Sequence, residues 1–395
     1  MTERILVVNT GSSSIKFQLF SVTSRNELRS TLKGQIEGVG ARPRLVSHNG
    51  DKERLVDSEW PAAEVDSIPK AWDQAVAFLR SQSDGRLPAA IGHRVVHGGP
   101  HYSGPTIVDD LVLDRLEKYV SLAPLHQPNN LAPIRAARLR YPELLQVACF
   151  DTAFHRTHPE IADRYAIPEQ LYAEGVRRYG FHGLSYEYVA GHLAEIAPDI
   201  AEGRVVIAHL GSGASMCALV AGRSVESTMG FTALDGLPMG TRPGQLDAGV
   251  VLYLMNEKQM SSAEIERLLY HECGLKALSG LSSDVRDLLA STSQRAKLAV
   301  DHLTYRIALF TALLAAAMGG IDGFVFTAGI GENAPAIRAA VAQRLSWLGM
   351  ELDPGANRTG QTKISRENSS IACFIIPTDE GSMIARHTLR ILLTR

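Results

Sequence analysis

A strand, a Gly/Ser turn and an alternating strand are encoded by Ile5-Leu-Val-Val-Asn-Thr-Gly-Ser-Ser-Ser-Ile-Lys-Phe-Gln-Leu-Phe20. The same plan returns in the second half of the chain, in Val205-Val-Ile-Ala-His-Leu-Gly-Ser-Gly-Ala-Ser-Met-Cys-Ala-Leu-Val220. A hairpin with a tight Gly/Ser tip points backbone N–H groups and hydroxyls at one spot, which suits a phosphate. Either stretch alone is more typical of an ordinary turn. The repetition predicts two duplicated domains that face each other across a phosphate-holding cleft.

The length and the order of the remaining segments agree with two α/β domains. The chain has 395 residues and a mass of 42.8 kDa, which is long for one hydrophobic core. Strand-like and helix-like segments alternate, as α/β proteins require. We expect buried strands at 5–8, 205–210, 323–327 and 371–376, and helices at 71–79 and after the capping pair Ser261 and Glu264, with Gly274 as a stop.

Composition narrows the class of protein. The net charge is −2 and the pI is near 6.7, so the sequence has no electrostatic footprint for nucleic acid or an anionic membrane. The four cysteines are scattered without metal-ligand spacing, which is typical of small core residues in a reducing compartment. The N-terminus does not resemble a signal peptide, and the longest apolar stretch, 307–318, is too short to span a bilayer. We therefore expect a cytoplasmic protein with no nucleic-acid or membrane partner.

A third glycine loop, Thr327-Ala-Gly-Ile-Gly-Glu-Asn-Ala334, follows the strand expected at 323–327. It matches the loose G-x-G-x-x-A pattern of dinucleotide-binding proteins, with Glu351 about 20 residues further on. The chain after it is too short for a complete dinucleotide domain. We interpret the loop as a strand-to-helix turn that approaches the backbone of a nucleotide. No G-x-x-x-x-G-K-[ST] motif occurs, which argues against a Walker-type ATPase.

Several charged residues stand where a small anion could be bound. Arg94 lies beside histidines and glycines, and Arg242 is held in a Gly/Pro loop. An arginine fork binds carboxylate or phosphate through two parallel hydrogen bonds. Asp151 ends an apolar run, where α/β sheets place active sites, although an Asx turn or a helix N-cap explains it equally well. Glu380 is likewise open to two interpretations: it could be a metal ligand, or its charge could offset a helix dipole.

Two long motifs resemble those that identify the acetate kinase family: Asn9-Thr-Gly-Ser-Ser-Ser-Ile-Lys16 and Gly92-His-Arg-Val-Val-His-Gly-Gly99. The resemblance runs in order along nearly the whole chain. It continues through Ala123-Pro-Leu-His126, Asp151-Thr-Ala-Phe-His155, Arg178-Tyr-Gly-Phe-His-Gly183, His209-Leu-Gly-Ser-Gly213, Met239-Gly-Thr-Arg242, Ser282-Ser-Asp-Val-Arg286 and Gly329-Ile-Gly-Glu-Asn333, and it ends at Gly381.

The resemblance implies two duplicated ribonuclease-H-like (actin-like ATPase) domains flanking a nucleotide cleft. The expected domains are an N-terminal lobe, 1–150, joined by a C-terminal helix, 382–395, and a second lobe, 151–381, that binds the nucleotide and forms a dimer. The implied activity is the reversible, Mg²⁺-dependent, in-line transfer of the γ-phosphoryl group of ATP to acetate, giving acetyl phosphate and ADP. Mn²⁺ is an alternative metal, propionate a minor substrate, and a homodimer the implied assembly.

The family also implies roles for individual residues. The catalytic group is Asp151, His182, Arg242 and Arg94, where Asp151 organises an arginine or metal-bound water, because a carboxylate nucleophile needs no strong base. Arg94, Val96, Leu125 and Phe181 would bind the small acid, and Asn9 and Glu380 would hold the metal. The residues expected around ATP are Ser12, Ser14, Lys16, His209, Leu210, Gly211, Ser212, Gly213, Asp284, Val285, Arg286, Gly329, Ile330, Gly331, Glu332 and Asn333.

Three places depart from the family pattern. Ser212 replaces a usual Asn, Gln245 and Ala248 stand in a G-D-x-D-P segment, and Ala233 replaces a Pro near the acyl pocket. The alternatives to an acetate kinase are a propionate or butyrate kinase of the same family, an actin-like or chaperone-type ATPase, and a nicotinamide dehydrogenase that rests on the Gly329 loop alone. The chain leaves no room for the peptide-binding domain of a chaperone.

Overall fold

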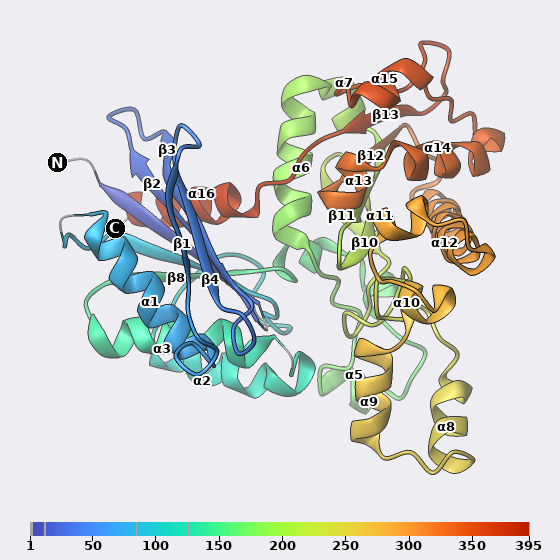
Figure 1. The fold of residues 1–395 in the computed structure, drawn as a ribbon. Coiled ribbons are helices and arrows are strands. Elements are labelled where there is room, and N and C mark those ends of the chain that lie inside the picture. The colour runs from blue at the N-terminus through green and yellow to red at the C-terminus, as the bar shows by residue number, and fades with distance from the viewer. Residues whose placement is uncertain (1–2, 12, 84, 125, 395) are drawn as a thin grey trace. The chain divides into compact units, whose positions relative to one another are not determined.

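The computed structural model describes residues 3–11, 13–83, 85–124 and 126–394, and its chain packs as two units (Figure 1). Unit 1 comprises Met1–Phe154 together with Asp379–Arg395, and unit 2 comprises His155–Thr378. The last helix of the chain therefore belongs to the same unit as the first strand. The metal-ligand candidate Glu380 lies in unit 1 for the same reason.

Unit 1 is built on an eight-stranded sheet with the order β5-β4-β3-β2-β1-β6-β8-β7. Its strands are β1 (Arg4–Thr10), β2 (Ile15–Val22), β3 (Leu28–Glu37), β4 (Arg44–Asn49), β5 (Arg54–Glu59), β6 (Ala90–Val95), β7 (Thr106–Ile107) and β8 (Leu145–Phe150). Its α-helices are α1 (Ile68–Ser81), α2 (Asp110–Lys118), α3 (Gln127–Arg140) and α16 (Glu380–Leu393).

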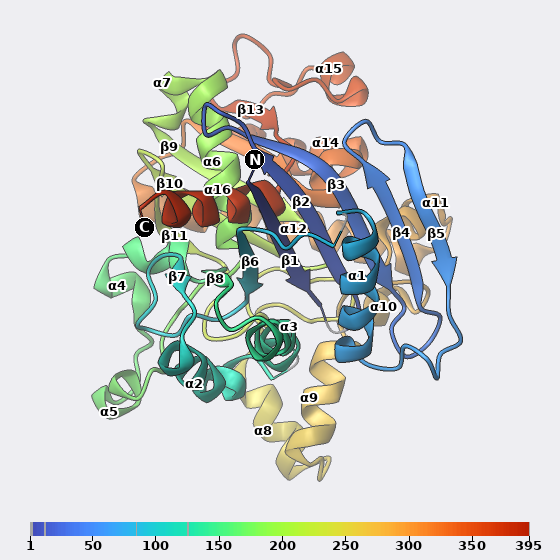
Figure 2. The same ribbon diagram turned by 90° about the vertical axis from the view of Figure 1, so that its left-hand side faces the viewer.

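The helices of unit 1 cover both faces of the sheet. The neighbouring residues Leu6 and Ile91 of β1 and β6 point toward α1 and α3. The next residue of β6, Gly92, points the other way, and a Cβ there would lie 2.3 Å from Oγ1 of Thr388 in α16. Because successive side chains of a strand alternate between faces, α16 lies on the face opposite α1 and α3 (Figure 2). Only a glycine at position 92 allows so close an approach of α16.

Unit 2 is built on a five-stranded sheet with the order β11-β10-β9-β12-β13. The strands are β9 (Arg204–Leu210), β10 (Ala214–Val220), β11 (Arg223–Ser227), β12 (Gly323–Thr327) and β13 (Ala372–Ile375). The α-helices are α4 (Glu160–Asp163), α5 (Glu169–Ala173), α6 (Gly183–Ile196), α7 (Pro198–Ala201), α8 (Ala248–Asn256), α9 (Ser262–His271), α10 (Gly274–Ser279), α11 (Val285–Ala290), α12 (Gln294–Met318), α13 (Ala328–Asn333), α14 (Pro335–Arg344) and α15 (Pro354–Thr359).

The two sheets share one topology, which confirms the duplicated fold class. In unit 1, β3, β2 and β1 are antiparallel, and β6 and β8 then run parallel to β1. In unit 2, β11, β10 and β9 are antiparallel, and β12 and β13 run parallel to β9. Unit 1 adds β4 and β5 at one edge and β7 at the other. Both Gly/Ser turns noticed in the sequence join the first two strands of this shared core.

The expected strands and helices occur, most of them with bounds that differ by one to three residues, and α9 and α12 depart further from expectation. The capping box of Ser261 and Glu264 opens α9, but that helix ends at His271, and Gly274, with φ +67°, begins α10 instead. The apolar stretch 307–318 is the second half of α12, which begins at Gln294. By length and composition α12 is the one described helix that reaches the size of a membrane span, and buried core helices pass the same test. Its buried residues, which include Leu303, pack against strands of unit 2.

Candidate active site

Four polar side chains of unit 1 meet through the alternation of two strands. Asn9 lies two residues after Val7 in β1, and Arg94 lies two residues after Gly92 in β6, so both share the face of the sheet that α16 covers. Glu380 is the first residue of α16, and Asp151 directly follows β8. The chain thus brings four segments that are distant in sequence to one end of the sheet.

Hydrogen bonds join these four residues into one network. Arg94 donates from Nε to Oδ1 of Asp151 (3.0 Å) and from Nη2 to Oδ2 (2.5 Å), and from Nη1 to Oδ1 of Asn9 (3.2 Å). Asn9 donates from Nδ2 to Oε2 of Glu380 (3.3 Å), and Nε of Arg94 lies 3.7 Å from the same carboxylate. The fork of Arg94 is therefore filled by Asp151 rather than open to a substrate carboxylate.

Burial makes this ion pair electrostatically strong. The Asp151 side chain is 2% exposed and the Arg94 side chain 17%. Burial alone would lower the pKa of Arg94, but the carboxylates of Asp151 and Glu380 outweigh it and hold that pKa above its ordinary value. Removing either partner of a buried pair leaves an uncompensated charge, which is strongly destabilising. Arg94 is thus a cation whose guanidinium Asp151 holds in one position.

Two further residues expected at this end lie in the first hairpin. Lys16 is the direct partner of Asn9 across β1 and β2, so the two side chains share one face, and the Lys16 side chain is exposed. Ser14 closes the turn by accepting a hydrogen bond at its carbonyl from the N–H of Gly11 (2.8 Å). Ser12 lies outside the described residues.

The second group belongs to unit 2 and centres on His182. This residue has φ +59°, in the left-handed region, and immediately precedes α6. Its Nδ1 lies 2.8 Å from Oγ of Ser215, which is bonded in turn to the hydroxyl of Tyr186 (2.5 Å). The ring stacks on that of His209 with centroids 4.2 Å apart and an interplanar angle of 13°. A strained, non-glycine backbone held by this many contacts is typical of functional positions.

The imidazole of His182 and the guanidinium of Arg242 converge at Gly213. A Cβ at Gly213 would lie 3.2 Å from Nε2 of His182 and 3.7 Å from Nη2 of Arg242. Arg242 donates from Nη1 to the carbonyl of Ala233 (2.9 Å), and no carboxylate of the described residues forms an ion pair with it. Its largely buried position lowers its pKa. A buried guanidinium without a carboxylate is a ready site for an external anion.

Sequence reasoning missed the residues that hold His182 in place. His155 is the last residue of the motif that begins at Asp151, and its Nε2 lies 2.9 Å from the carbonyl of Phe181, next to His182. Its ring also packs so closely on Gly180 that a Cβ there would lie 2.6 Å from it, and Gly180 has φ +73°. Burial lowers the pKa of His155 to about 4, so its ring is neutral at pH 7. The available signal was a histidine four residues after Asp151, at the end of the same motif.

The expected ATP segments of unit 2 occupy a turn and two helix starts. The first segment, His209 to Gly213, ends β9 and forms the turn to β10, and Ser185 Oγ lies 2.8 Å from Nδ1 of His209. Asp284 caps α11 by accepting from the N–H of Arg286 (2.8 Å), and these two side chains also form an ion pair. The expected segment 284–286 therefore opens a helix.

The third ATP segment, 329–333, lies inside the short helix α13, directly after β12. This confirms the expected strand-to-helix turn. Gly331 packs on β12, where a Cβ would lie 3.3 Å from the carbonyl carbon of Phe326, whereas nothing lies within 4 Å of a Cβ at Gly329. The contact at 331 is thus tight for any residue larger than glycine, whereas the surroundings of a Cβ at 329 are open.

The residues expected to bind the small acid are only partly described. Leu125 lies outside the described residues. Val96 is buried in unit 1, where its N–H donates to Oδ1 of Asn130 (2.9 Å), and Phe181 is buried in unit 2. Ala233 is partly buried, and its carbonyl fixes Arg242. The departure from the family pattern at 233 therefore touches a catalytic candidate directly.

Two oxygen donors of unit 1 are of the chemical type that binds a small divalent cation. Asn9 and Glu380 offer an amide oxygen and a carboxylate, which are ligands that Mg²⁺ prefers. Among the described residues no group of three or more His, Cys, Asp or Glu side chains could hold a metal alone. Mg²⁺ commonly keeps several waters and binds through one or two carboxylates plus substrate phosphates. The residues present therefore suit a metal that arrives with a nucleotide.

Comparison with known proteins gives one consistent answer. The model of the acetokinase family matches residues 4–386. The chain is 59% identical to an acetate kinase of Nitrobacter hamburgensis, over 100% of this chain and 97% of that protein. It is 54% identical to an acetate kinase of Rhizobium meliloti, over 99% and 98%.

Solved structures agree with these relatives. A propionate kinase of Francisella tularensis superposes with a TM-score of 0.91 at 35% identity, covering 98% of this chain and 99% of that one. An acetate kinase of Porphyromonas gingivalis superposes with a TM-score of 0.87 at 35% identity, covering 99% and 100%.

Proposed function

This chain belongs to the acetokinase family, a family of phosphotransferases with a carboxyl group as acceptor, and from that premise we propose that it transfers the γ-phosphoryl group of ATP to acetate, reversibly and with Mg²⁺. The products of the forward reaction are acetyl phosphate and ADP. The observation that carries the proposal is the pair of His182 and Arg242 at Gly213.

The pair suits the chemistry of phosphoryl transfer. The transferred group spreads negative charge over three equatorial oxygens, so catalysis depends on positioning and on electrostatic stabilisation. Arg242 supplies a cation that no carboxylate of the described residues pairs with. His182 supplies a ring nitrogen, and its hydrogen bond with Ser215 fixes the orientation of the ring. We assign both to stabilisation of the transferring phosphoryl group. Acetate is already nucleophilic at pH 7, so neither residue has to remove a proton.

Unit 1 supplies the oxygen ligands of the metal in this proposal. Asn9 and Glu380 would hold Mg²⁺, which neutralises phosphate charge when it is bound. Asp151 orients Arg94 and keeps its guanidinium in one position. Lys16, beside Asn9, adds a positive charge on the same face. The segments at 209–213, 284–286 and 329–333 are the proposed contacts of ATP.

The acceptor is tested by direct comparison of three acids. Acyl phosphate trapped as hydroxamate measures turnover with acetate, propionate and butyrate, and we expect the highest kcat/KM for acetate and a lower but measurable value for propionate. One methylene group in an apolar pocket is worth about 1–3 kcal/mol, so the preference is moderate. The superposition on a propionate kinase makes that acid the second candidate. A kcat/KM ratio of propionate to acetate above one would assign propionate, and absence of hydroxamate with all three acids would refute the proposal.

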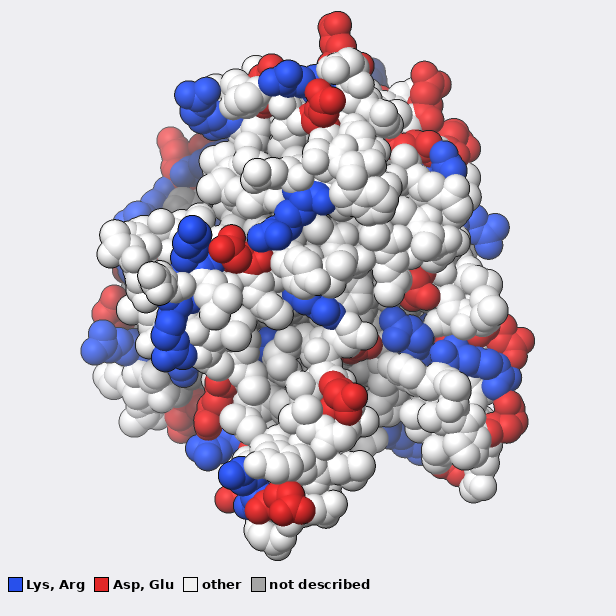
Figure 3. All heavy atoms as spheres, turned by 90° about the vertical axis from the view of Figure 1, so that its right-hand side faces the viewer, with Lys and Arg blue, Asp and Glu red and all other residues white. Residues whose placement is uncertain are grey.

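A homodimer in the cytoplasm completes the proposal. Large apolar side chains are exposed on α8 and α12 of unit 2: Val250, Leu252, Tyr253, Met255, Leu298, Tyr305, Leu309 and Leu313. Figure 3 shows wide uncharged areas between scattered charges on the side of the molecule where α12 lies. Such surface commonly marks contact with another protein. Light scattering at micromolar concentration should give twice the mass of the chain, and a monomer mass would reject the dimer.

A further inference from the structure

The ring of His182 is held by a short array of hydrogen bonds inside unit 2. Tyr186 lies one helical turn further along the chain, in α6, and its N–H donates to the carbonyl of His182 (3.0 Å). Ser215 lies directly opposite His209 across β9 and β10. The Oγ of Ser215 is 2.8 Å from Nδ1 of His182 and 2.5 Å from the hydroxyl oxygen of Tyr186. Helix α6 and the hairpin of β9 and β10 together therefore orient this ring.

The hydroxyl hydrogens of the array decide which nitrogen of His182 carries a proton. Tyr186 and Ser215 are buried, and each has one hydroxyl hydrogen to donate. Burial raises the pKa of Tyr186 well above its ordinary value, so its hydroxyl stays protonated. If Tyr186 donates to Ser215 and Ser215 donates to Nδ1 of His182, both hydrogens have acceptors. If Nδ1 donates instead, one of the two hydroxyl hydrogens has no acceptor among the described residues, which costs about 1–3 kcal/mol for a buried donor.

A second array of unit 2 has the same direction, and there a backbone carbonyl determines it. Nε2 of His155 contacts the carbonyl of Phe181, which can only accept, so this Nε2 carries the proton. Because burial keeps the ring of His155 neutral at pH 7, its Nδ1 accepts from the hydroxyl of Ser224 (2.9 Å). The Oγ of Ser224 then accepts from Nε2 of His158 (2.8 Å). Donation from a serine to Nδ1 of a histidine thus occurs at an independent place in the same unit.

We propose that Ser215 and Tyr186 are positioning residues that hold His182 as a neutral ring with its proton on Nε2. The inference rests on the proposed role of His182 at the transferring phosphoryl group. Nε2 of His182 lies 3.2 Å from the point where a Cβ of Gly213 would be, and Nη2 of Arg242 lies 3.7 Å from that point. The oxygens of a phosphoryl group accept hydrogen bonds, so Nε2–H attracts them, whereas a lone pair on Nε2 would repel them. The neutral tautomer supplies this donor without a second cation near Arg242.

Nitrogen-15 NMR of the full-length protein, labelled at its histidines, tests the position of the proton directly. The chain has 13 histidines, and the signals that disappear in His182→Gln are those of His182. At pH 8, above the ordinary histidine pKa of about 6.5, we expect a pyrrole-type shift at Nε2 and a pyridine-type shift at Nδ1. A proton on Nδ1, or on both nitrogens, would overturn the proposal. The spectrum is recorded without substrates, so its result is independent of whether the chain transfers a phosphoryl group to acetate.

Variants of the array separate positioning from stability. Ser215→Ala removes the donor to Nδ1, so both tautomers of His182 should be populated and its two nitrogen shifts should move toward each other. Hydroxamate trapping should show a kcat about tenfold lower, with the KM of acetate and of ATP changed by less than about twofold. Tyr186→Phe leaves the hydroxyl of Ser215 in place, so the tautomer should be kept and kcat should fall less than in Ser215→Ala.

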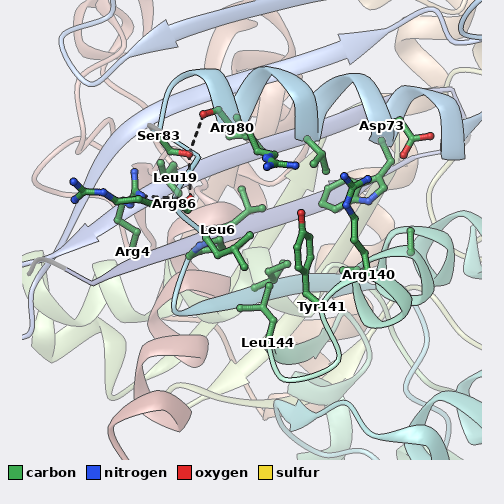
Figure 4. Close-up of a pocket in the computed structure, with 18 residues that line it drawn as sticks. Arg4, Leu6, Leu19, Asp73, Arg80, Ser83, Arg86, Arg140, Tyr141 and Leu144 are labelled. Carbon is green, nitrogen blue, oxygen red and sulfur yellow. Dashed lines mark hydrogen bonds between the residues drawn. The ribbon is translucent and has the colours of Figure 1, made fainter.

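Ser83→Ala is the matched control in unit 1. Ser83 is also buried, and its hydroxyl donates to the carbonyl of Arg86 (3.1 Å), as Figure 4 shows. This variant also loses a buried hydroxyl, but it should keep kcat and the nitrogen shifts of His182. Unchanged shifts or unchanged kcat in Ser215→Ala, or an equal loss of kcat in Ser83→Ala, would contradict the positioning role. If Ser215→Ala does not fold, the wild-type spectrum alone still decides the position of the proton.

Discussion

At the scale of single residues, Arg242 is the position where we expect substitution to reduce turnover most. It is a largely buried cation that donates a hydrogen bond to the carbonyl of Ala233. Arg242→Ala should lower kcat by about 10²–10³-fold, like other lost electrostatic donors. Arg242→Lys should recover only part of this loss, because a point charge cannot reproduce a planar fork. Hydroxamate trapping measures both, with Arg223→Ala, an exposed arginine of unit 2, as the control.

Turnover of Arg242→Ala close to wild type would remove this residue from catalysis. An equal loss of kcat in Arg223→Ala would show that the measured effect comes from the charge or stability of unit 2 rather than from a local role of Arg242.

Gly213 gives a second test that removes no charge. A Cβ there would lie 3.2 Å from Nε2 of His182 and occupy the spot where we place the phosphoryl group. Gly213→Ala should therefore lower kcat/KM by at least about tenfold, a loss of roughly 1.4 kcal/mol in transition-state binding, with little change in the thermal melt. Gly191→Ala is the matched control, because that glycine lies within α6 with nothing within 4 Å of its Cβ. The control should keep wild-type activity, and full activity of Gly213→Ala would contradict the assignment.

Single residues also show where prediction from sequence stops. Arg94 and Asp151 are 57 positions apart, and no pattern within either motif predicts that the two side chains pair. Once the strand order is known, alternation along β1 and β6 explains why Asn9 and Arg94 share a face. Sequence-derived roles for Val96 and Phe181 stay predictions, since burial in their own units does not reveal a ligand.

At the scale of elements, sequence patterns predicted correctly those features that depend only on interactions within a few residues. Both hairpins formed as expected, because a Gly/Ser turn between two apolar strands is specified within a few residues. The capping box of α9 also formed as expected, because it too depends on residues only three apart. The end of α9 was wrong by three residues, because Gly274 adopts its positive φ to approach the backbone of Met239 and Arg242, a tertiary contact.

The capping box predicts a local effect on stability. Ser261 accepts from the N–H of Glu264, and the Glu264 carboxylate accepts from the N–H of Ser261 (2.8 Å). Ser261→Ala should destabilise α9 by about 1 kcal/mol and speed its hydrogen exchange roughly fivefold. Ser262→Ala, one residue further on and also exposed, leaves the cap intact and should not change exchange. Equal exchange rates in the two variants would show that the cap does not limit opening of α9.

At the scale of the whole molecule, buried histidines predict sensitivity to acid. Burial lowers the pKa of His93 in unit 1 to about 4, and in unit 2 it lowers that of His155 to about 4 and that of His158 to about 2. Below pH 6.5 histidines of the unfolded chain bind protons, whereas these buried histidines of the folded chain stay neutral. The free energy of unfolding therefore falls as the pH drops from 6.5 toward 4. Each histidine should cost about 2 kcal/mol between pH 7 and pH 5.

Unit 2 should therefore lose more stability than unit 1 over this range, since it holds two such histidines. Hydrogen exchange in urea at pH 7 and pH 5, resolved by segment, measures the two units separately. His155→Gln should be less stable at pH 7 but should lose about 2 kcal/mol less on acidification. The exposed His271→Gln should behave as wild type. An unchanged pH dependence in His155→Gln would mean that this residue is not the source of the acid sensitivity.

The duplication of the fold is the part of the whole molecule that sequence predicted best, because both halves carry the same Gly/Ser turn between two apolar strands. The return of the chain to unit 1 was expected from the family resemblance alone, because no local pattern states that α16 packs on Gly92.

That return has a consequence for synthesis on the ribosome. Unit 2 emerges complete once residue 378 has left the exit tunnel, whereas the sheet of unit 1 waits, with the face around Gly92 uncovered, until α16 follows. Glu380 arrives with that helix, so a nascent chain lacks one of the two proposed metal ligands and a closed first unit until α16 has been synthesised. A chaperone that shields apolar strands should therefore engage the nascent first unit, and premature termination shortly before α16 should yield a folded second unit attached to an unfinished and inactive first one.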